Sequence, residues 1–200
     1  MPTYINLNGA VAQCISALTT SMRFDGALNP TLSELSHHLV PYPKTHFLMA
    51  SYSPFLNEER VYLDQISIPQ MSHYLFNPAN QLARVDTCEG KFMAVSICYR
   101  GENIIPKNVS RACCELKTNR TIDFVDWCPT GFRMGINYLT PIPSPAINMA
   151  HLTKDCFMVY NATSVYQIFS RNNHQFDQMY SKRAFVHWYM KEGAELDELT

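Results

Sequence analysis

One carboxylate, one aromatic ring and one amide carry most of the chemistry that the sequence offers. Glu34 follows the segment RFDGALN and lies in a short leucine-containing stretch, where a carboxylate can act as a general acid or base. Tyr4 and Asn8 are four positions apart, which places them one turn apart on the same face of a helix. A ring and an amide in that arrangement suit stacking on a nucleobase and hydrogen bonding to its edge.

The same three residues also have plainer interpretations. An exposed Glu near a helix N-terminus stabilises the helix by roughly a few tenths of a kcal/mol, and most such residues do nothing more. Tyr4 is equally well explained as a core aromatic residue, and Asn8 as a surface amide. Spacing alone favours these plainer interpretations.

The sequence lacks the motifs of a self-contained active site. It has no Gly-rich turn through which backbone N–H groups would approach a phosphate, and no Gly-x-Ser-x-Gly motif. His37 and His38 are adjacent and diverge by about 100° on a helix, so they are poorly placed to share a metal ion. We therefore expect no metal site and no complete catalytic centre in this chain.

Composition and charge disfavour nucleic-acid and membrane partners and favour a protein of the cytosol. The formal net charge is −1, which gives no reason to expect nucleic acid or an anionic membrane as a partner. The apolar runs are short, so no transmembrane segment is expected, and the opening MPTYINLNG lacks the features of a signal peptide. Seven cysteines without a Cys-x-x-Cys pair fit reduced thiols in the cytosol.

Hydrophobic periodicity predicts an α+β fold that begins with a long helix over residues 4–23. A second helix is expected to have Asn29 as its N-cap and Pro30 in its first position. On this helix Glu34 points away from the leucines of the buried stripe, which are Leu32, Leu35 and Leu39.

The middle of the chain is predicted to form a two-layer sandwich of a mixed sheet, with about four strands, and helices. The helices are expected to start at Ser67 and at Pro106. Alternation in FRMGINY indicates a half-buried strand. The segments with strand character are 46–52, 91–99, 121–127, 132–138 and 155–160.

Long stretches of the sequence resemble the tubulin family. The segments TYINLN, RFDGALN, LVPYP, FVDWCPTGFRMGINY and SKRAFVHWYMKEG are similar, in order and spacing, to the second half of a tubulin chain. Two features resemble the α type: Glu34, where the β type has a Lys, and a long loop between Tyr138 and Cys156. The resemblance covers essentially the whole chain.

This resemblance implies an organisation in three parts. Residues 1–28 resemble the core helix of the nucleotide-binding domain, 29–160 the intermediate two-layer sandwich domain, and 161–200 a truncated C-terminal helical region. The family's N-terminal GTP-binding half has no counterpart in this sequence. The acidic tail to which microtubule-associated proteins bind also has no counterpart in this sequence. A fragment or truncated product is therefore expected.

The resemblance also implies a role in the microtubule cytoskeleton of the cytoplasm, in a heterodimer with β-tubulin. The family's Glu that matches Glu34 faces the GTP of the neighbouring subunit and helps to activate the water that hydrolyses it. Tyr4 and Asn8 match residues that stack on guanine and bind its edge, so only part of a GTP site is implied. The residues matching subunit contacts are Tyr62 in the lateral loop 53–65, and Trp127, Arg133, His187 and Trp188 in longitudinal regions.

Several positions depart from the family pattern. Thr31 stands where typical α chains have an acidic residue beside the catalytic Glu, and Leu63 where they have a lateral-contact histidine. Two other functions stay open: a module that caps or decoys tubulin partners without polymerising, and a truncated product without function. In the latter case the first helix would expose an apolar face that another domain normally covers.

Overall fold

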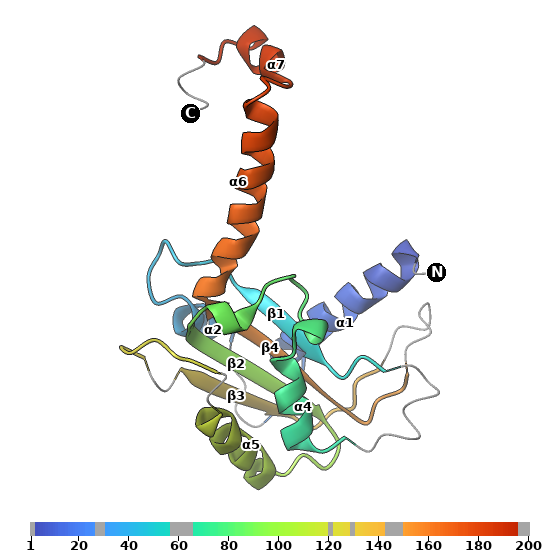
Figure 1. Ribbon diagram of the computed structural model, residues 1–200. Coiled ribbons are helices and arrows are strands. Elements are labelled where there is room, and N and C mark those ends of the chain that lie inside the picture. Colours follow the sequence, from blue (N-terminus) through green and yellow to red (C-terminus); the bar gives the residue numbers. More distant parts are fainter. Residues whose placement is uncertain are drawn as a thin grey trace. The chain divides into compact units, whose positions relative to one another are not determined.

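A mixed β-sheet organises the larger of the two units into which the chain divides (Figure 1). The computed structural model describes residues 3–26, 31–56, 66–119, 122–128, 131–142 and 150–195. The larger unit is Met1–Ser164 and the smaller is Val165–Thr200. The predicted division into 1–28, 29–160 and 161–200 stays a prediction.

The sheet of the larger unit has four strands within the described ranges. They are β1 (Met49–Ser53), β2 (Phe92–Gly101), β3 (Phe132–Asn137) and β4 (Lys154–Ala162). Their order is β1-β4-β2-β3; β2 and β3 are parallel, whereas β4 is antiparallel to both of its neighbours. The predicted α+β class, with a mixed sheet of about four strands and helices, is confirmed.

Helices cover both faces of this sheet. On one face lie α1 (Tyr4–Arg23) and α2 (Leu32–Leu39), and on the other lie α4 (Ile68–Leu75) and α5 (Pro106–Thr118). Short 3-10 turns lie between α4 and β2 at Pro78–Asn80 and Thr87–Glu89, and a third follows β4 at Thr163–Val165. The predicted helix starts are confirmed, because Ser67 is the N-cap of α4 and Pro106 is the first residue of α5.

The start of α2 differs from the prediction. Its N-cap is Thr31, and the predicted cap and first residue, Asn29 and Pro30, lie outside the described residues. The Thr31 hydroxyl accepts a hydrogen bond from the Glu34 N–H, and the Glu34 carboxylate accepts one from the Thr31 N–H, each at 3.3 Å. This capping box is the local reason that the helix begins here. Leu32 is consequently in the first turn and 44% exposed, so it does not belong to the buried stripe.

Two strand predictions are corrected. Residues 121–127 were expected to form a strand. Over the described residues 122–128, the structure has only a single β-bridge, between Phe124 and Phe92. The chain turns immediately afterwards, because the Cys128 N–H donates to the Val125 carbonyl. In β3 the predicted alternation of burial is absent, and its last three residues are all buried, since helices lie on both faces of the sheet.

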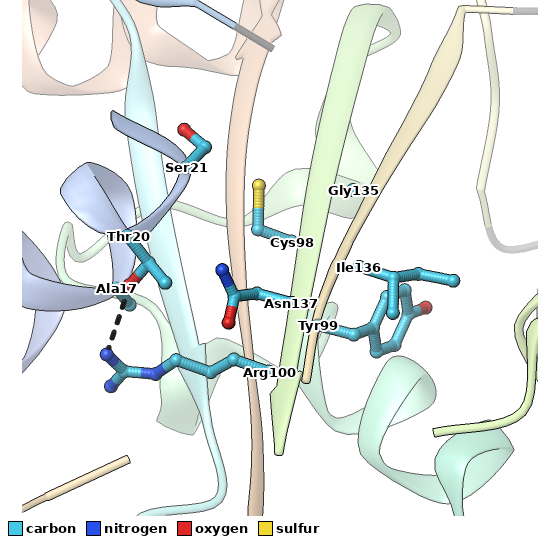
Figure 2. Close-up of a pocket in the computed structure, with 9 residues that line it drawn as sticks. All are labelled: Ala17, Thr20, Ser21, Cys98, Tyr99, Arg100, Gly135, Ile136 and Asn137. Carbon is cyan, nitrogen blue, oxygen red and sulfur yellow. Dashed lines mark hydrogen bonds between the residues drawn. The ribbon is translucent and has the colours of Figure 1, made fainter. Parts of the chain in front are cut away.

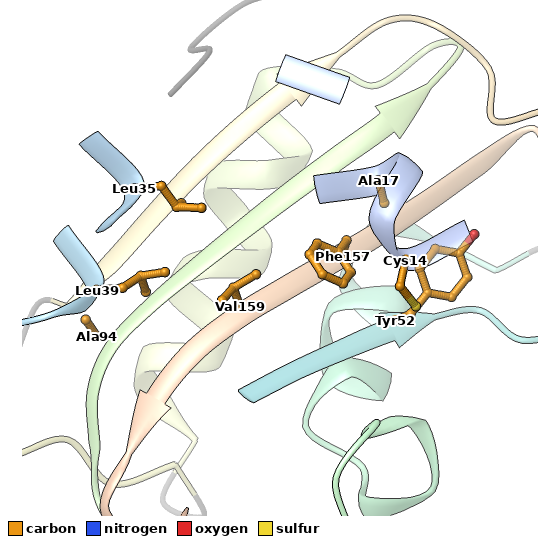
Figure 3. Packing of buried hydrophobic residues seen from close by; sticks show 8 residues of the cluster. All are labelled: Cys14, Ala17, Leu35, Leu39, Tyr52, Ala94, Phe157 and Val159. Atoms are coloured by element: carbon orange, nitrogen blue, oxygen red, sulfur yellow. The ribbon is translucent and has the colours of Figure 1, made fainter. Parts of the chain in front are cut away.

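An apolar cluster joins α1 and α2 to the sheet (Figure 3). Leu35 and Leu39 reach it from α2, and Cys14 and Ala17 from α1. Small side chains on α1 let that helix approach the strands closely. The sheet supplies Tyr52, Ala94, Phe157 and Val159.

Beside this cluster, a buried ion pair connects α1 to two strands. Arg100 of β2 lies opposite Asp155 of β4 in the ladder. Arg100 Nε is 2.7 Å and 2.8 Å from the two carboxylate oxygens of Asp155, and Nη2 is 2.6 Å from Oδ2. Arg100 Nη1 also donates to the hydroxyls of Ser16 and Thr20 on α1, at 3.2 Å and 3.3 Å. Burying a charge is costly unless the charge is paired and hydrogen-bonded, and these contacts meet both conditions.

A tyrosine from a third strand completes this network. The Tyr52 hydroxyl donates to Asp155 Oδ2 at 2.6 Å, and Gln13 Nε2 of α1 donates to the Tyr52 oxygen at 3.4 Å. Burial raises the pKa of Tyr52, and the Asp155 carboxylate raises it further. Tyr52 therefore remains a hydrogen-bond donor at neutral pH.

The smaller unit contains α6 (Tyr166–Tyr180) and α7 (Val186–Lys191). No residue of α6 is buried, and Phe176 stacks on Tyr180 with ring centroids 5.4 Å apart. Arg183 and Phe185, between the two helices, adopt left-handed backbone conformations. The predicted helical character of this region is confirmed for the residues described.

Replacing Asp155 by Ala should lower the free energy of unfolding by about 3–5 kcal/mol, because it leaves the Arg100 guanidinium buried without its counter-charge. Urea unfolding followed by circular dichroism measures this change. The matched control is Arg111→Ala, which breaks an exposed pair with Glu115 on α5 and should cost no more than about 0.5 kcal/mol. Equal losses for the two variants would contradict the role assigned to the buried pair.

Candidate functional site

The Glu34 carboxylate is exposed but not isolated. Its side chain is 56% accessible, and Oε2 accepts hydrogen bonds from the Thr31 N–H at 3.3 Å and from Arg133 Nη2 at 3.1 Å. Arg133 belongs to β3, an edge strand of the sheet, and its side chain is 36% accessible. The structure therefore brings together two of the predicted site residues, one from a helix and one from a strand.

The contact between Glu34 and Arg133 was not visible in the sequence. The two residues are 99 positions apart, and Arg133 was predicted only as a contact with another subunit. The available signal was the alternation in β3, which puts Arg133 on the sheet face that α2 covers. That signal requires the strand order and the position of α2 to be known first.

A thiol lies close to Arg133 on the neighbouring strand. Burial raises the pKa of Cys98 on β2 to about 11, although the charge of Arg133 acts to lower it. Cys98 is therefore a protonated thiol at neutral pH, and a thiol is a far weaker nucleophile than a thiolate. It does not supply the nucleophile that Glu34 lacks.

Figure 2 shows the small cavity that Cys98 lines between α1 and the strands β2 and β3. Arg100 crosses it towards Thr20, and Asn137 lies beside them. The cavity has a volume of about 10 Å³. That is room for no more than about one water molecule, so this cavity is not a nucleotide pocket.

Tyr4 and Asn8 lie in the first turns of α1, and both are exposed. Tyr4 is 83% exposed, so the interpretation as a core aromatic residue is wrong. An exposed apolar stripe continues from Tyr4 along α1. Its other members are Leu7, Val11, Ile15 and Met22.

The predicted contact residues are at the surface where the structure describes them. Trp127 is 54% exposed and makes an edge-to-face contact with Tyr42, with ring centroids 5.6 Å apart. Trp188 is 58% exposed, and the exposed His187 lies beside it on α7. Tyr62 and most of the predicted lateral loop lie outside the described residues.

Neither a metal-binding cluster nor a membrane-spanning helix is found in the described parts of the chain. No group of three or more His, Cys, Asp or Glu side chains there could hold a metal ion. In the same residues, no helix combines the length and apolar character needed to cross a bilayer.

Comparison with known families places this fold. The family described as the Tubulin C-terminal domain matches residues 43–174. The chain belongs to the tubulin family. The match spans all four strands together with α4 and α5, which means that most of the larger unit is shared with the family. Trp127 and Arg133 lie inside the matched range, whereas Glu34 and the residues of α1 and α7 lie outside it.

Membership of the tubulin family indicates a cytoskeletal function. It also indicates that the partners of this chain are tubulin subunits in general, and that its location is the cytoskeleton of the cytoplasm. The four-stranded sheet, which lies wholly within the matched residues, is thus the scaffold of a tubulin-family domain.

Replacing Glu34 by Gln should change the free energy of unfolding by no more than about 0.5 kcal/mol, because the ion pair is exposed and Gln keeps an acceptor for the Thr31 N–H. Thermal unfolding of the two proteins measures this difference.

The matched control is Thr31→Ala, which removes the N-cap and should cost about 1 kcal/mol. A loss of more than about 2 kcal/mol in Glu34→Gln would show that the carboxylate is needed for folding.

Proposed function

We propose that this chain acts as an α-type tubulin subunit that pairs with β-tubulin and supplies Glu34 to a GTP bound by the neighbouring subunit. The observation that carries the proposal is the exposed carboxylate of Glu34. Within the described residues, only Oε2 has hydrogen-bond partners. The second oxygen, Oε1, is left to accept a proton from a water molecule.

The scaffold supports this role, because Glu34 lies on a firmly placed helix. Leu35 and Leu39 are 8% and 0% exposed and fix α2 in the apolar cluster. The capping box fixes the first turn, where Glu34 lies. A carboxylate on a packed helix is held more closely in position than one on a loop.

The reaction needs a second chain in this proposal. The sequence has no Gly-rich loop whose backbone N–H groups could bind the phosphates of a nucleotide. Glu34 would act as the general base that takes a proton from the attacking water, while the partner holds the GTP. Hydrolysis would then depend on assembly, because neither chain has all the groups.

Tyr4 and Asn8 support a partial GTP site of this chain's own. Both are accessible on one face of α1, as a stacking ring and a hydrogen-bonding amide require. The exposed Trp127, His187 and Trp188 are suited to longitudinal contacts, since aromatic residues are enriched at protein interfaces.

The 200-residue chain alone should show no measurable GTP binding, because no phosphate-binding segment accompanies Tyr4 and Asn8. Isothermal titration calorimetry with Mg-GTP tests this, with a tubulin-family heterodimer depleted of its exchangeable nucleotide as the positive control. A dissociation constant in the micromolar range for the isolated chain would contradict the proposal of a partial site.

Glu34→Gln should lower the GTP hydrolysis of mixed assemblies by about 100-fold or more, because the amide cannot accept the proton from water. Phosphate release from GTP-loaded β-tubulin is measured with and without the added chain. Co-sedimentation in the same samples should be unchanged, since the surface retains its shape. Unchanged phosphate release with Glu34→Gln would contradict the proposal that Glu34 acts on the GTP of the neighbouring subunit.

A capping module is the second candidate, and the exposed stripe of α1 favours it. Tyr4, Leu7, Val11, Ile15 and Met22 present apolar side chains that a polymerising subunit would be expected to cover. Stoichiometric co-sedimentation with microtubules supports the subunit; arrest of growth at a small molar fraction supports the cap.

A further inference from the structure

We infer that Arg133 is the positioning residue for the Glu34 carboxylate, an inference that rests on the function proposed above for Glu34. Its guanidinium donates to Oε2 at 3.1 Å, and the Thr31 N–H donates to the same oxygen at 3.3 Å. Both donors converge on one oxygen. The other oxygen, Oε1, has no hydrogen-bond partner among the described residues.

The two donors constrain different motions of the carboxylate. Thr31 is in the same helical turn, so its N–H fixes Oε2 only relative to α2. Arg133 comes from β3, and its contact therefore fixes the carboxylate relative to the sheet. A Glu side chain has three rotatable bonds, and one local contact leaves much of that freedom. The second contact, which comes from the sheet, restricts the orientation of the carboxylate further.

The site of Arg133 in the sheet suits this role. It lies on the parallel β2–β3 pair opposite Ser96, and the next residues of β3 on the same face, Gly135 and Asn137, are buried. The strand is thus anchored directly beside the residue that holds Glu34. Arginine is also suited to the task, because its planar guanidinium presents donors in a fixed geometry.

Because the Glu34–Arg133 pair is exposed, its effect on catalysis can be distinguished from its effect on folding stability. The two side chains are 36% and 56% accessible, and exposed ion pairs contribute little to folding. Arg133 should therefore affect the rate of hydrolysis much more than the stability of the chain. This contrast distinguishes its role from a structural one.

The test compares Arg133→Gln and Arg133→Lys in the assembly assay with GTP-loaded β-tubulin. Arg133→Gln should lower the maximal rate of phosphate release by about 10-fold or more, with the half-saturating concentration of the chain unchanged, because misplacing a reacting group is costly. Arg133→Lys, which keeps the charge, should restore part of the rate. The matched control is Arg111→Gln, an exposed arginine on α5, which should have no effect.

A second readout examines the contact in the isolated chain. The side-chain N–H signals of Arg133 in NMR spectra should change in Glu34→Gln, while those of Arg111 do not. Unchanged Arg133 signals would overturn the proposed contact whatever the rates are. This readout also remains usable if Arg133→Gln fails to fold.

The outcomes separate this inference from the proposed function. If Glu34→Gln abolishes hydrolysis but Arg133→Gln behaves as Arg111→Gln does, the positioning role is overturned and the proposed function stands. A raised half-saturating concentration at an unchanged maximal rate would make Arg133 a partner contact, and would also overturn the inference. If Glu34→Gln has no effect, the proposed function fails, and the positioning role fails with it.

Discussion

The buried pair of Arg100 and Asp155 is the constraint on which the rest of the larger unit depends. It joins neighbouring strands, and through Ser16 and Thr20 it determines where α1 lies on the sheet. An apolar contact alone would tolerate a shift of the helix along the strands, whereas a fully engaged guanidinium tolerates few positions. Tyr52 donates to Asp155 and accepts from Gln13, and these hydrogen bonds connect the strand β1 and a second position on α1 to the same network.

The Glu34 site follows from the same arrangement on a smaller scale. Leu39 and Leu35 place α2 on the face that α1 also covers, and this brings Glu34 within reach of Arg133. One pair is buried and holds the fold, while the other is exposed and contributes little to stability. Its exposure is what makes the second pair available to a partner.

The sequence predicted local features well and long-range ones poorly. The helix over 4–23 and the starts of α4 and α5 were correct, because spacing, caps and prolines act within a few residues. The segment 121–127 has strand-like composition but turns after Val125, which composition does not reveal. Asp155 and Arg100 were missed as partners, since nothing in their local sequence shows that β2 and β4 are neighbours. The contact of Glu34 with Arg133 was missed for the same reason.

The uneven attachment of α1 has a consequence for recognition. Its buried residues begin at Gly9 and continue to Thr20, so the first turn and a half, with Tyr4 and Asn8, has no tertiary support within the described chain. Such a helix end frays easily, because opening it breaks few contacts. A molecule that binds there must order the end as well as touch it, and part of the binding free energy is spent on that ordering. Binding at this end of α1 and formation of its helix are thus coupled, so a change that stabilises the helical form also raises the affinity.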